Sequence, residues 1–137
     1  TRVNGSSSLA GAYNVTASYG NIGLSVSLPE AGQYLVFGEV RCQLQVNSGT
    51  GNITIRLFDS TASSAITESE RITDYSANSV ITGSTVPISE YVNVSGPSTI
   101  DVQAAVGAGS YLFAQVVSDG SGRSRLHYEK KGPYVPP

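Results

Sequence analysis

The carboxylates, the single cysteine and the single histidine are the residues whose chemistry could support catalysis. Glycoside hydrolysis needs two carboxylates that face one cleft, and no spacing in this sequence selects such a pair. Glu68 and Glu70 would share one face of an extended segment, which is more typical of a solvated strand edge. A reactive thiol at Cys42 would need a basic partner, and His127 is distant in sequence. Cys42 falls on the apolar side of an alternating segment, so we expect a buried structural side chain.

Two Gly-rich segments resemble ligand-binding loops only in part. Residues 118–122, SDGSG, could bind calcium through the Asp119 carboxylate and backbone carbonyls, but a hairpin turn is the simpler interpretation. Residues 49–52, GTGN, lack the lysine and the following helix of a phosphate-binding loop. The sequence therefore predicts no catalytic residue, no metal site and no cofactor, and we expect the protein not to be an enzyme.

The composition argues against two classes of partner. Charged residues make up 13% of the 137 residues and the formal net charge is −2, whereas nucleic-acid-binding domains carry a basic patch or stripe. No apolar run approaches the ~20 residues of a membrane-spanning helix. We therefore expect neither nucleic-acid binding nor membrane insertion. With one cysteine, the chain cannot form an internal disulfide.

Apolar and polar residues alternate in several segments, as they do in half-buried β-strands. The alternation is regular in residues 22–28 and 53–59 and longest in residues 34–46. These strands recur about every ten residues without a convincing helix between them, which predicts an antiparallel sandwich or barrel. Further strands are expected at residues 80–94, where Pro87 restricts the strand to an edge, a bulge or a strand start, and at residues 100–106, 111–117 and 123–131.

The same pattern suggests a single domain with short extensions. Residues 1–21 are interpreted as an N-terminal arm with a first irregular strand, residues 22–130 as the domain, and residues 131–137 as an extended tail. The Gly-rich segment 47–52 is predicted to close a hairpin between the strands on either side. Residues 60–79 are predicted to hold a strand or two and a long loop, with a short helix as the alternative.

Two segments are apolar on both sides, although a strand in a two-layer sandwich needs only one apolar side. A strand in a two-layer sandwich needs one apolar side because its other side meets water, yet residues 34–37 and 111–117 are apolar on both. Contiguous exposed apolar side chains mark contact surfaces. We therefore expect copies of the chain to associate through outer side chains that lie near one another if the two strands pair. The alternative is that the arm or the tail covers them. The expected interface residues are Leu35, Phe37, Leu112, Ala114 and Val116.

Four segments resemble the strand patterns of C1q/TNF-like jelly rolls. Residues 28–46, LPEAGQYLVFGEVRCQLQV, are similar to the second-strand signature of that family, in which a proline and a glycine precede a tyrosine that opens a long strand. The other similar segments are GNITIRLFDSTASSAI, GPSTIDVQAAVGAG and RSRLHYEKK. Together the resemblance covers roughly residues 20–130.

This resemblance implies an all-β, antiparallel jelly-roll sandwich that forms a homotrimer with apolar residues along its threefold axis. The Ser/Thr/Gly-rich sequence, without a collagen-like stalk, is more similar to the versions found in bacteriophage particles than to animal C1q. The implied function is a non-enzymatic protein on the virion surface, where the trimer decorates or stabilises the capsid. Its partners would be copies of itself and capsid or fibre proteins of the same particle.

Two other functions stay open. As the receptor-binding head of a tail fibre or spike, the protein would turn residues 60–79 and 118–122 toward a host receptor or glycan. As a carbohydrate-binding module, it would stack Tyr75, Tyr91 or Tyr134 on sugar rings, although the sequence has no tryptophan for that purpose.

Overall fold

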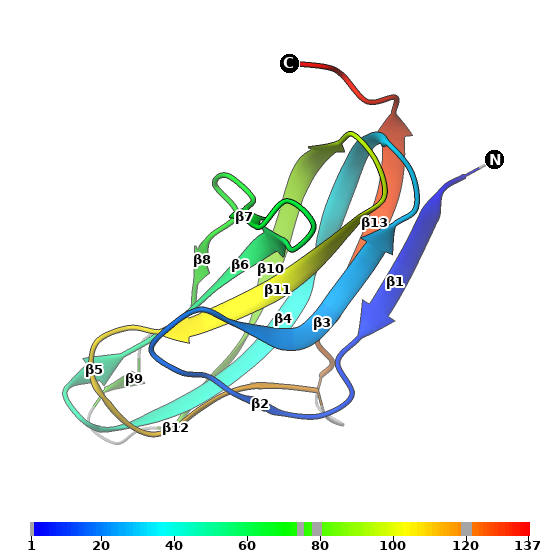
Figure 1. The fold of residues 1–137 in the computed structure, drawn as a ribbon. Coiled ribbons are helices and arrows are strands. Elements are labelled where there is room, and N and C mark those ends of the chain that lie inside the picture. The colour runs from blue at the N-terminus through cyan, green and yellow to red at the C-terminus, as the bar shows by residue number, and fades with distance from the viewer. Residues whose placement is uncertain (1, 74–75, 78–80, 119–121) are drawn as a thin grey trace.

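The computed structural model describes residues 2–73, 76–77, 81–118 and 122–137, with residues 76–77 described as backbone alone. All the regular structure in these ranges is β-strand, and two antiparallel sheets pack face to face (Figure 1). The prediction of an all-β antiparallel sandwich is therefore confirmed.

The strands differ greatly in length, from two residues to the 17 residues of β4. In chain order they are β1 (Asn4–Ser8), β2 (Tyr13–Asn14), β3 (Gly20–Leu28), β4 (Gly32–Ser48), β5 (Thr50–Gly51), β6 (Ile53–Asp59), β7 (Ser64–Ala65), β8 (Arg71–Ile72), β9 (Ser76–Ala77), β10 (Thr82–Val94), β11 (Ser98–Val106), β12 (Ser110–Val117) and β13 (Arg125–Gly132).

The first sheet, sheet A, is built around β4. Strand β10 pairs with β4 along one edge. On the other edge β13 pairs with the first half of β4 and β12 with the second half, so these two strands follow one another along it. Strand β1 then pairs with β13, and β2 with β12. Because β10 has only β4 as a partner in the sheet, Pro87 lies on an edge strand as predicted.

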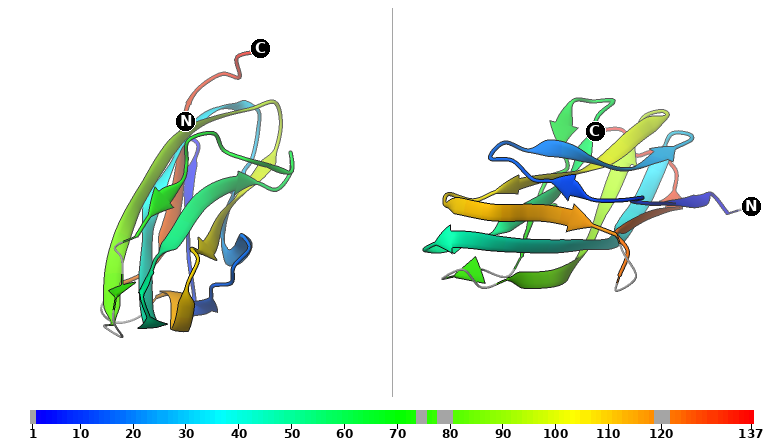
Figure 2. Two further views of the ribbon diagram at one scale, coloured as in Figure 1. Left: turned by 90° about the vertical axis from the view of Figure 1, so that its left-hand side faces the viewer. Right: turned by 90° about the horizontal axis from the view of Figure 1, so that it is seen from below.

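The second sheet, sheet B, has the order β3-β11-β6, with β7 and β8 pairing with β6. Figure 2 shows it stacked on one side of sheet A, and the core fills the space between the two. The alternation predicted from the sequence is confirmed there, because every second residue is buried along the central strands. The inward residues of β4 that are at most 1% exposed are Tyr34, Val36, Val40, Cys42, Leu44 and Val46, and in β6 Ile53, Ile55 and Leu57 are 0% exposed.

The predicted hairpin around residues 47–52 is wrong. Strand β4 belongs to sheet A and β6 to sheet B, so this segment carries the chain from one sheet to the other. Its short strand β5 pairs with β9 instead. The alternation of residues 34–46 and 53–59 predicts which side of each strand is buried. It is equally compatible with two neighbours in one sheet and with two strands facing each other across a core.

Residues 60–73 contain two short strands, β7 and β8, and no helix, so the helical alternative is wrong for the described part of this segment. Glu68 lies in a turn with a φ of 61°, and therefore does not share a strand face with Glu70 as expected. A buried hydroxyl holds the segment to β6. The Ser69 Oγ accepts the Leu57 N–H at 3.0 Å and donates to the Ile66 carbonyl at 2.8 Å. Residues 74–75 and 78–80 lie outside the described part of the chain.

Gly38 permits a close backbone approach in the middle of β4. A Cβ atom there would clash with the carbonyl oxygen of Arg125 on β13, whereas a Cβ atom at Gly83 of β10 would find its nearest neighbour, the Cys42 carbonyl oxygen, at 3.7 Å. We expect Gly38→Ala to lower the free energy of unfolding by about 3 kcal/mol, as overpacked sites do. We expect Gly83→Ala to change it by less than about 1 kcal/mol. Urea denaturation measures both, and equal losses would contradict the close approach.

Candidate functional site

The outward side of sheet A carries an apolar area at one end. Leu35 and Phe37 of β4 point away from the core and are half-buried. The strand register places Tyr91 of β10 beside Leu35, and His127 of β13 beside Phe37. We call Leu35, Phe37, Tyr91 and His127 the Phe37 patch. Two of its members were predicted as interface residues. The other two were missed, because their place beside β4 depends on strand pairings that the sequence does not show.

The Phe37 patch offers a flat aromatic surface with a hollow next to it. The rings of Phe37 and His127 are stacked, with centroids 5.2 Å apart and planes inclined by 19°. The side chain of Tyr91 is 67% exposed. A hollow of about 250 Å³ adjoins the stack, and its lining residues are Asn4, Gly5, Ser6, Phe37, His127, Tyr128 and Glu129.

The terminal segments border this face. Strand β1 pairs edge to edge with β13 and so extends the sheet. The C-terminal tail is fixed at the end of β10, where the Asn93 amide donates to the Val135 carbonyl at 2.7 Å and accepts the Val135 N–H at 3.1 Å. Because Tyr91 keeps most of its surface exposed, the two termini leave at least this member of the patch open.

Charged side chains border the apolar centre on the β13 side. The Lys131 ammonium lies 3.0 Å from the Glu129 carboxylate, and its hydrogen bond, followed by its charge, lowers the pKa of Glu129. Arg125 of β13 lies opposite Glu39 of β4 in the strand register. An apolar centre with a polar rim is the usual composition of a protein–protein interface.

The remaining predicted interface residues do not join this patch. Ala114 and Val116 are 7% and 0% exposed and belong to the core, so placing them on the outer side was wrong. The reason is a β-bulge between Tyr111 and Phe113, which inserts Leu112 as an extra residue. One inserted residue exchanges the inward and outward sides of all the residues that follow it.

Leu112 is 57% exposed, but it lies far from the Phe37 patch. Strand β12 pairs with residues 41–48 of β4, about ten residues beyond Leu35, which corresponds to roughly 30 Å along a strand. The expectation that the two apolar sets adjoin is therefore wrong. Leu112 borders a separate hollow of about 360 Å³, lined by Asn14, Val15, Val106, Tyr111, Leu112, Phe113 and Ala114.

Cys42 and His127 lie on opposite sides of sheet A. The Cys42 side chain is in the core, where burial raises the pKa of its thiol to about 12. His127 stacks on Phe37 on the outer side. The sheet therefore separates the two residues that were weighed as a thiol and its base.

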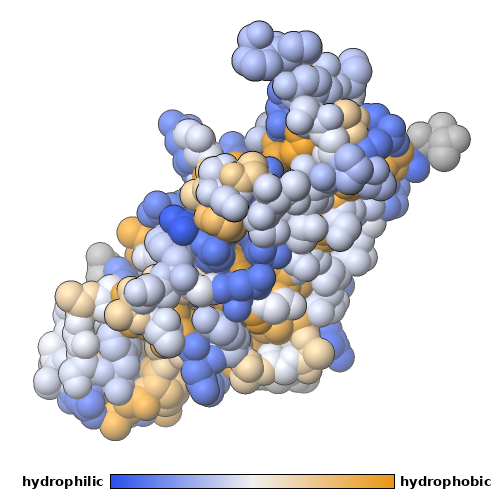
Figure 3. Space-filling model, in the orientation of Figure 1, coloured by the Kyte–Doolittle hydropathy of each residue, from blue (hydrophilic) through white to orange (hydrophobic). Residues whose placement is uncertain are grey.

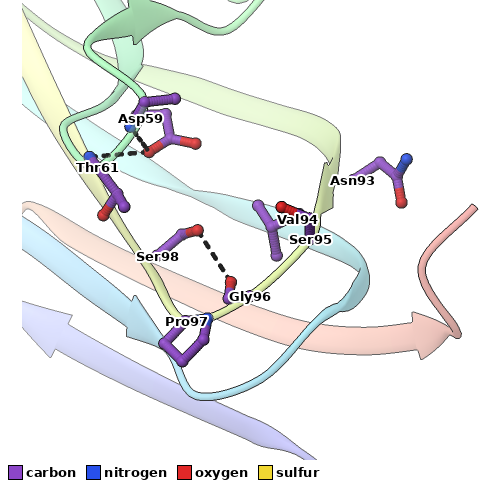
Figure 4. A pocket seen from close by; sticks show the side chains of 9 residues that line it. Asp59, Thr61, Asn93, Val94, Ser95, Gly96, Pro97 and Ser98 are labelled. Carbon is purple, nitrogen blue, oxygen red and sulfur yellow. Dashed lines mark hydrogen bonds between the residues drawn. The ribbon is translucent and has the colours of Figure 1, made fainter. Parts of the chain in front are cut away.

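A cleft lies at the end of the sandwich, between the loop after β6 and the turn from β10 to β11. Figure 4 shows its lining, and its volume is about 350 Å³. The Asp59 Oδ1 atom accepts the N–H groups of Thr61 and Ala62, each at 3.0 Å, so this carboxylate shapes the loop. A second cleft of about 510 Å³ continues along β10 past Tyr91. Of the tyrosines considered for sugar stacking, Tyr91 borders that cleft, Tyr134 is half-buried and Tyr75 lies outside the described residues.

Within residues 2–73, 81–118 and 122–137, no group of three His, Cys, Asp or Glu side chains is placed to hold a metal ion. Most of the 118–122 loop lies outside the described residues, and the flanking strands β12 and β13 do not pair with each other. The described chain contains no helix with the length and apolarity needed to cross a membrane.

Comparisons with solved structures identify the fold. Eiger TNF from S. frugiperda superposes with a TM-score of 0.66 over 99% of this chain and 96% of that chain, at 11% sequence identity. The fold is a TNF-like jelly roll. The predicted jelly-roll architecture is thereby confirmed.

Other comparisons add little. A structure of infectious bursal disease virus, Gt strain, gives a TM-score of 0.47 at 14% identity over 95% of this chain, and a VP2 subviral particle of that virus gives 0.46 at 12% identity over 97%. This chain spans 31% and 38% of those longer chains. No protein-family model and no curated protein matches the sequence.

Asp101 on β11 provides a pH-dependent test of the loop beside the cleft. Burial raises the pKa of its carboxyl, hydrogen bonds with Ser60 and Asn21 act against this, and the charge of Asp59 adds to it. A raised folded-state pKa means that the charged form opposes folding above that pKa, and that the penalty vanishes below the ordinary value of 3.8. We expect Asp101→Asn to be at least as stable as the wild type at pH 7, with the difference shrinking toward pH 4. Chemical denaturation across this range measures it, and a constant difference would contradict the assignment.

Proposed function

We propose that this protein is a non-enzymatic component of a bacteriophage virion surface, where it forms a homotrimer that decorates or stabilises the capsid. The Phe37 patch is the observation that carries the proposal. It is an apolar area on the outer side of a sandwich whose inner sides already form a complete core. A TNF-like jelly roll with one such side is suited to association through that side.

Burial of the patch supplies the driving force for association. Removing apolar surface from water contributes about 25 cal/mol per Å², or about 1.5–3 kcal/mol for a large side chain taken from full exposure to complete burial. Leu35 and Phe37 contribute less than this, because they are already half-buried in one subunit. A threefold arrangement buries Leu35, Phe37 and Tyr91 once in every subunit, and a head-to-tail contact that turns each copy by 120° closes after three copies. The resulting assembly would be finite.

The outer side of sheet B differs from the patch. Strand β3 presents Gly23, Ser25 and Ser27 outward. The guanidinium of Arg56 lies 3.8 Å from the Tyr19 ring centroid and 5.5 Å from that of Phe58, so it covers both rings. Figure 3 looks onto this side and shows hydrophilic and hydrophobic residues mixed across it. This contrast favours sheet A as the side on which subunits meet.

Attachment to a particle needs surface beyond the trimer contact. The C-terminal tail projects from the end of the sandwich (Figure 1), and Val135 within it is 51% exposed. The Ser/Thr/Gly-rich sequence and the resemblance to bacteriophage jelly rolls support a capsid as the partner. In that role the tail and the N-terminal arm would reach neighbouring proteins of the particle.

A charge in the patch should abolish assembly. Leu35→Asp places a carboxylate where apolar contact is proposed, so we expect the variant to sediment as a 14.2 kDa monomer and the wild type at three times that mass. Ser27→Asp places the same charge on the outer side of sheet B and should stay trimeric. Circular dichroism verifies that the monomeric variant is folded. A monomeric wild type would refute the proposed trimer.

Capsid attachment is tested on particles. On heating, the capsids of phage particles that lack the protein should break open at a lower temperature than those of particles with the protein restored. Electron microscopy should place the protein on the capsid. Density at a fibre tip, with capsid stability unchanged, would favour the receptor-binding alternative.

The specific feature that favours a receptor-binding head is the cleft along β10. Its lining includes the exposed Tyr91 together with Glu68 and Glu90, a combination of ring and hydrogen-bonding groups that suits a sugar. Binding on a glycan array that Tyr91→Ala abolishes would support this function. The absence of any glycan binding would exclude both a carbohydrate-binding module and a receptor-binding head that recognises a glycan.

A further inference from the structure

His127 is the one histidine of the chain and lies in the Phe37 patch. Histidine is the side chain whose ordinary pKa, about 6.5, brings a change of charge close to neutral pH. The residue therefore places a titratable group on the face through which we propose that subunits meet.

The residues beside His127 on the two neighbouring strands are apolar or uncharged. On β4 its ring contacts Phe37, with Leu35 as the next outward residue. On β1 the residue opposite is Ser6, and the next outward positions are Asn4 and Ser8. A phenyl ring attracts a cation, but more weakly than water does, so burial at this position favours the neutral imidazole.

Charged groups of both signs lie near His127. On β13 the outward neighbours of His127 are Arg125 and Glu129, and on β4 Glu39 lies opposite Arg125. Glu129 is bonded to Lys131 at 3.0 Å and also feels the charge of Arg2. Among the described residues no carboxylate forms an ion pair with His127. A proton added to this imidazole would thus bring a positive charge for which the face has no reserved partner.

We propose that His127 makes the assembly sensitive to pH, so that the trimer holds the neutral imidazole and separates when that ring is protonated. This inference rests on the proposed trimer and on its contact through the Phe37 patch. A threefold axis repeats the charge three times, so each protonation opposes the others across the interface. Mild acid would then release subunits that stay folded.

The sign follows from proton linkage. Burial in the trimer favours the neutral ring, so separated subunits bind more protons than the trimer does. Dissociation therefore becomes more favourable as pH falls through the range where an exposed imidazole gains its proton. Because each of the three subunits can take up a proton on separation, the dissociation constant should be larger at pH 5.5 than at pH 7.5.

Other groups do not reproduce this behaviour. The carboxyl of Asp101, whose pKa is raised by burial, lies in sheet B and has the same surroundings whether or not sheet A meets a partner. The thiol of Cys42 has a pKa of about 12 and is enclosed in the core. Neither group should contribute to a pH dependence of assembly between pH 5.5 and 7.5.

The test measures the mass of the full chain by sedimentation velocity at pH 7.5 and 5.5, at equal ionic strength and protein concentration. We expect the wild type to be trimeric at pH 7.5 and to dissociate at pH 5.5. His127→Gln, which cannot gain a proton, should show the same degree of association at both pH values, whatever the substitution does to the strength of the contact. His127→Lys, which is always charged, should be monomeric at both. As a matched control, Ser27→His in the His127→Gln background returns a histidine to the other sheet and should restore no pH dependence.

The outcomes separate the inference from the function beneath it. A wild type that is trimeric at both pH values, or a His127→Gln variant that dissociates in acid as the wild type does, would overturn the inference and leave the trimer standing. A wild type that is monomeric at both values would overturn the proposed assembly and the inference with it. Loss of the β-sheet signal in circular dichroism at pH 5.5 would assign the acid sensitivity to the subunit itself, which also overturns the inference.

Discussion

Backbone pairing along β4 is the interaction on which the rest of the structure depends. This strand of 17 residues pairs with β10 on one edge and with β12 and β13 in succession on the other. Its inward side chains supply the centre of the core. Strand β13 approaches closely enough at Gly38 that no side chain fits there. One strand thus holds the other strands of sheet A together and supplies the centre of the core.

The succession of two partners along β4 explains why this strand changes character along its length. Beside β13 its outward side is apolar, with Leu35 and Phe37. Beside β12 its outward side is polar, and the amide of Gln43 donates to Gln115 at 3.0 Å, which in turn donates to Asn14 at 3.0 Å. These side-chain amides find hydrogen-bond partners on neighbouring strands of the same chain. The apolar half has no such internal partner, which is why the candidate contact is confined to it.

The fold could be predicted from the sequence where a local pattern determines it. Alternation in residues 22–28, 34–46 and 53–59 gave the buried sides, and Pro87 gave an edge strand. The errors arose where the decisive contact is remote. The sheet to which β6 belongs depends on its pairing with β11, and the side on which Ala114 and Val116 lie depends on a bulge against β4. Half of the candidate site was missed for the same reason, because His127 stands about 90 residues from the ring that it contacts.

The pairing of β1 with β13, in which Asn4 lies opposite Glu129, joins the two ends of the described chain. Contacts between such distant residues form late, because the intervening loop must close before they contribute any stability. A chain emerging from the ribosome therefore cannot complete sheet A until β13 has been synthesised. Until then Phe37 has no imidazole beside it and the hollow next to it lacks its wall. The stacked pair of Phe37 and His127 is consequently completed only once β13 has paired with β4.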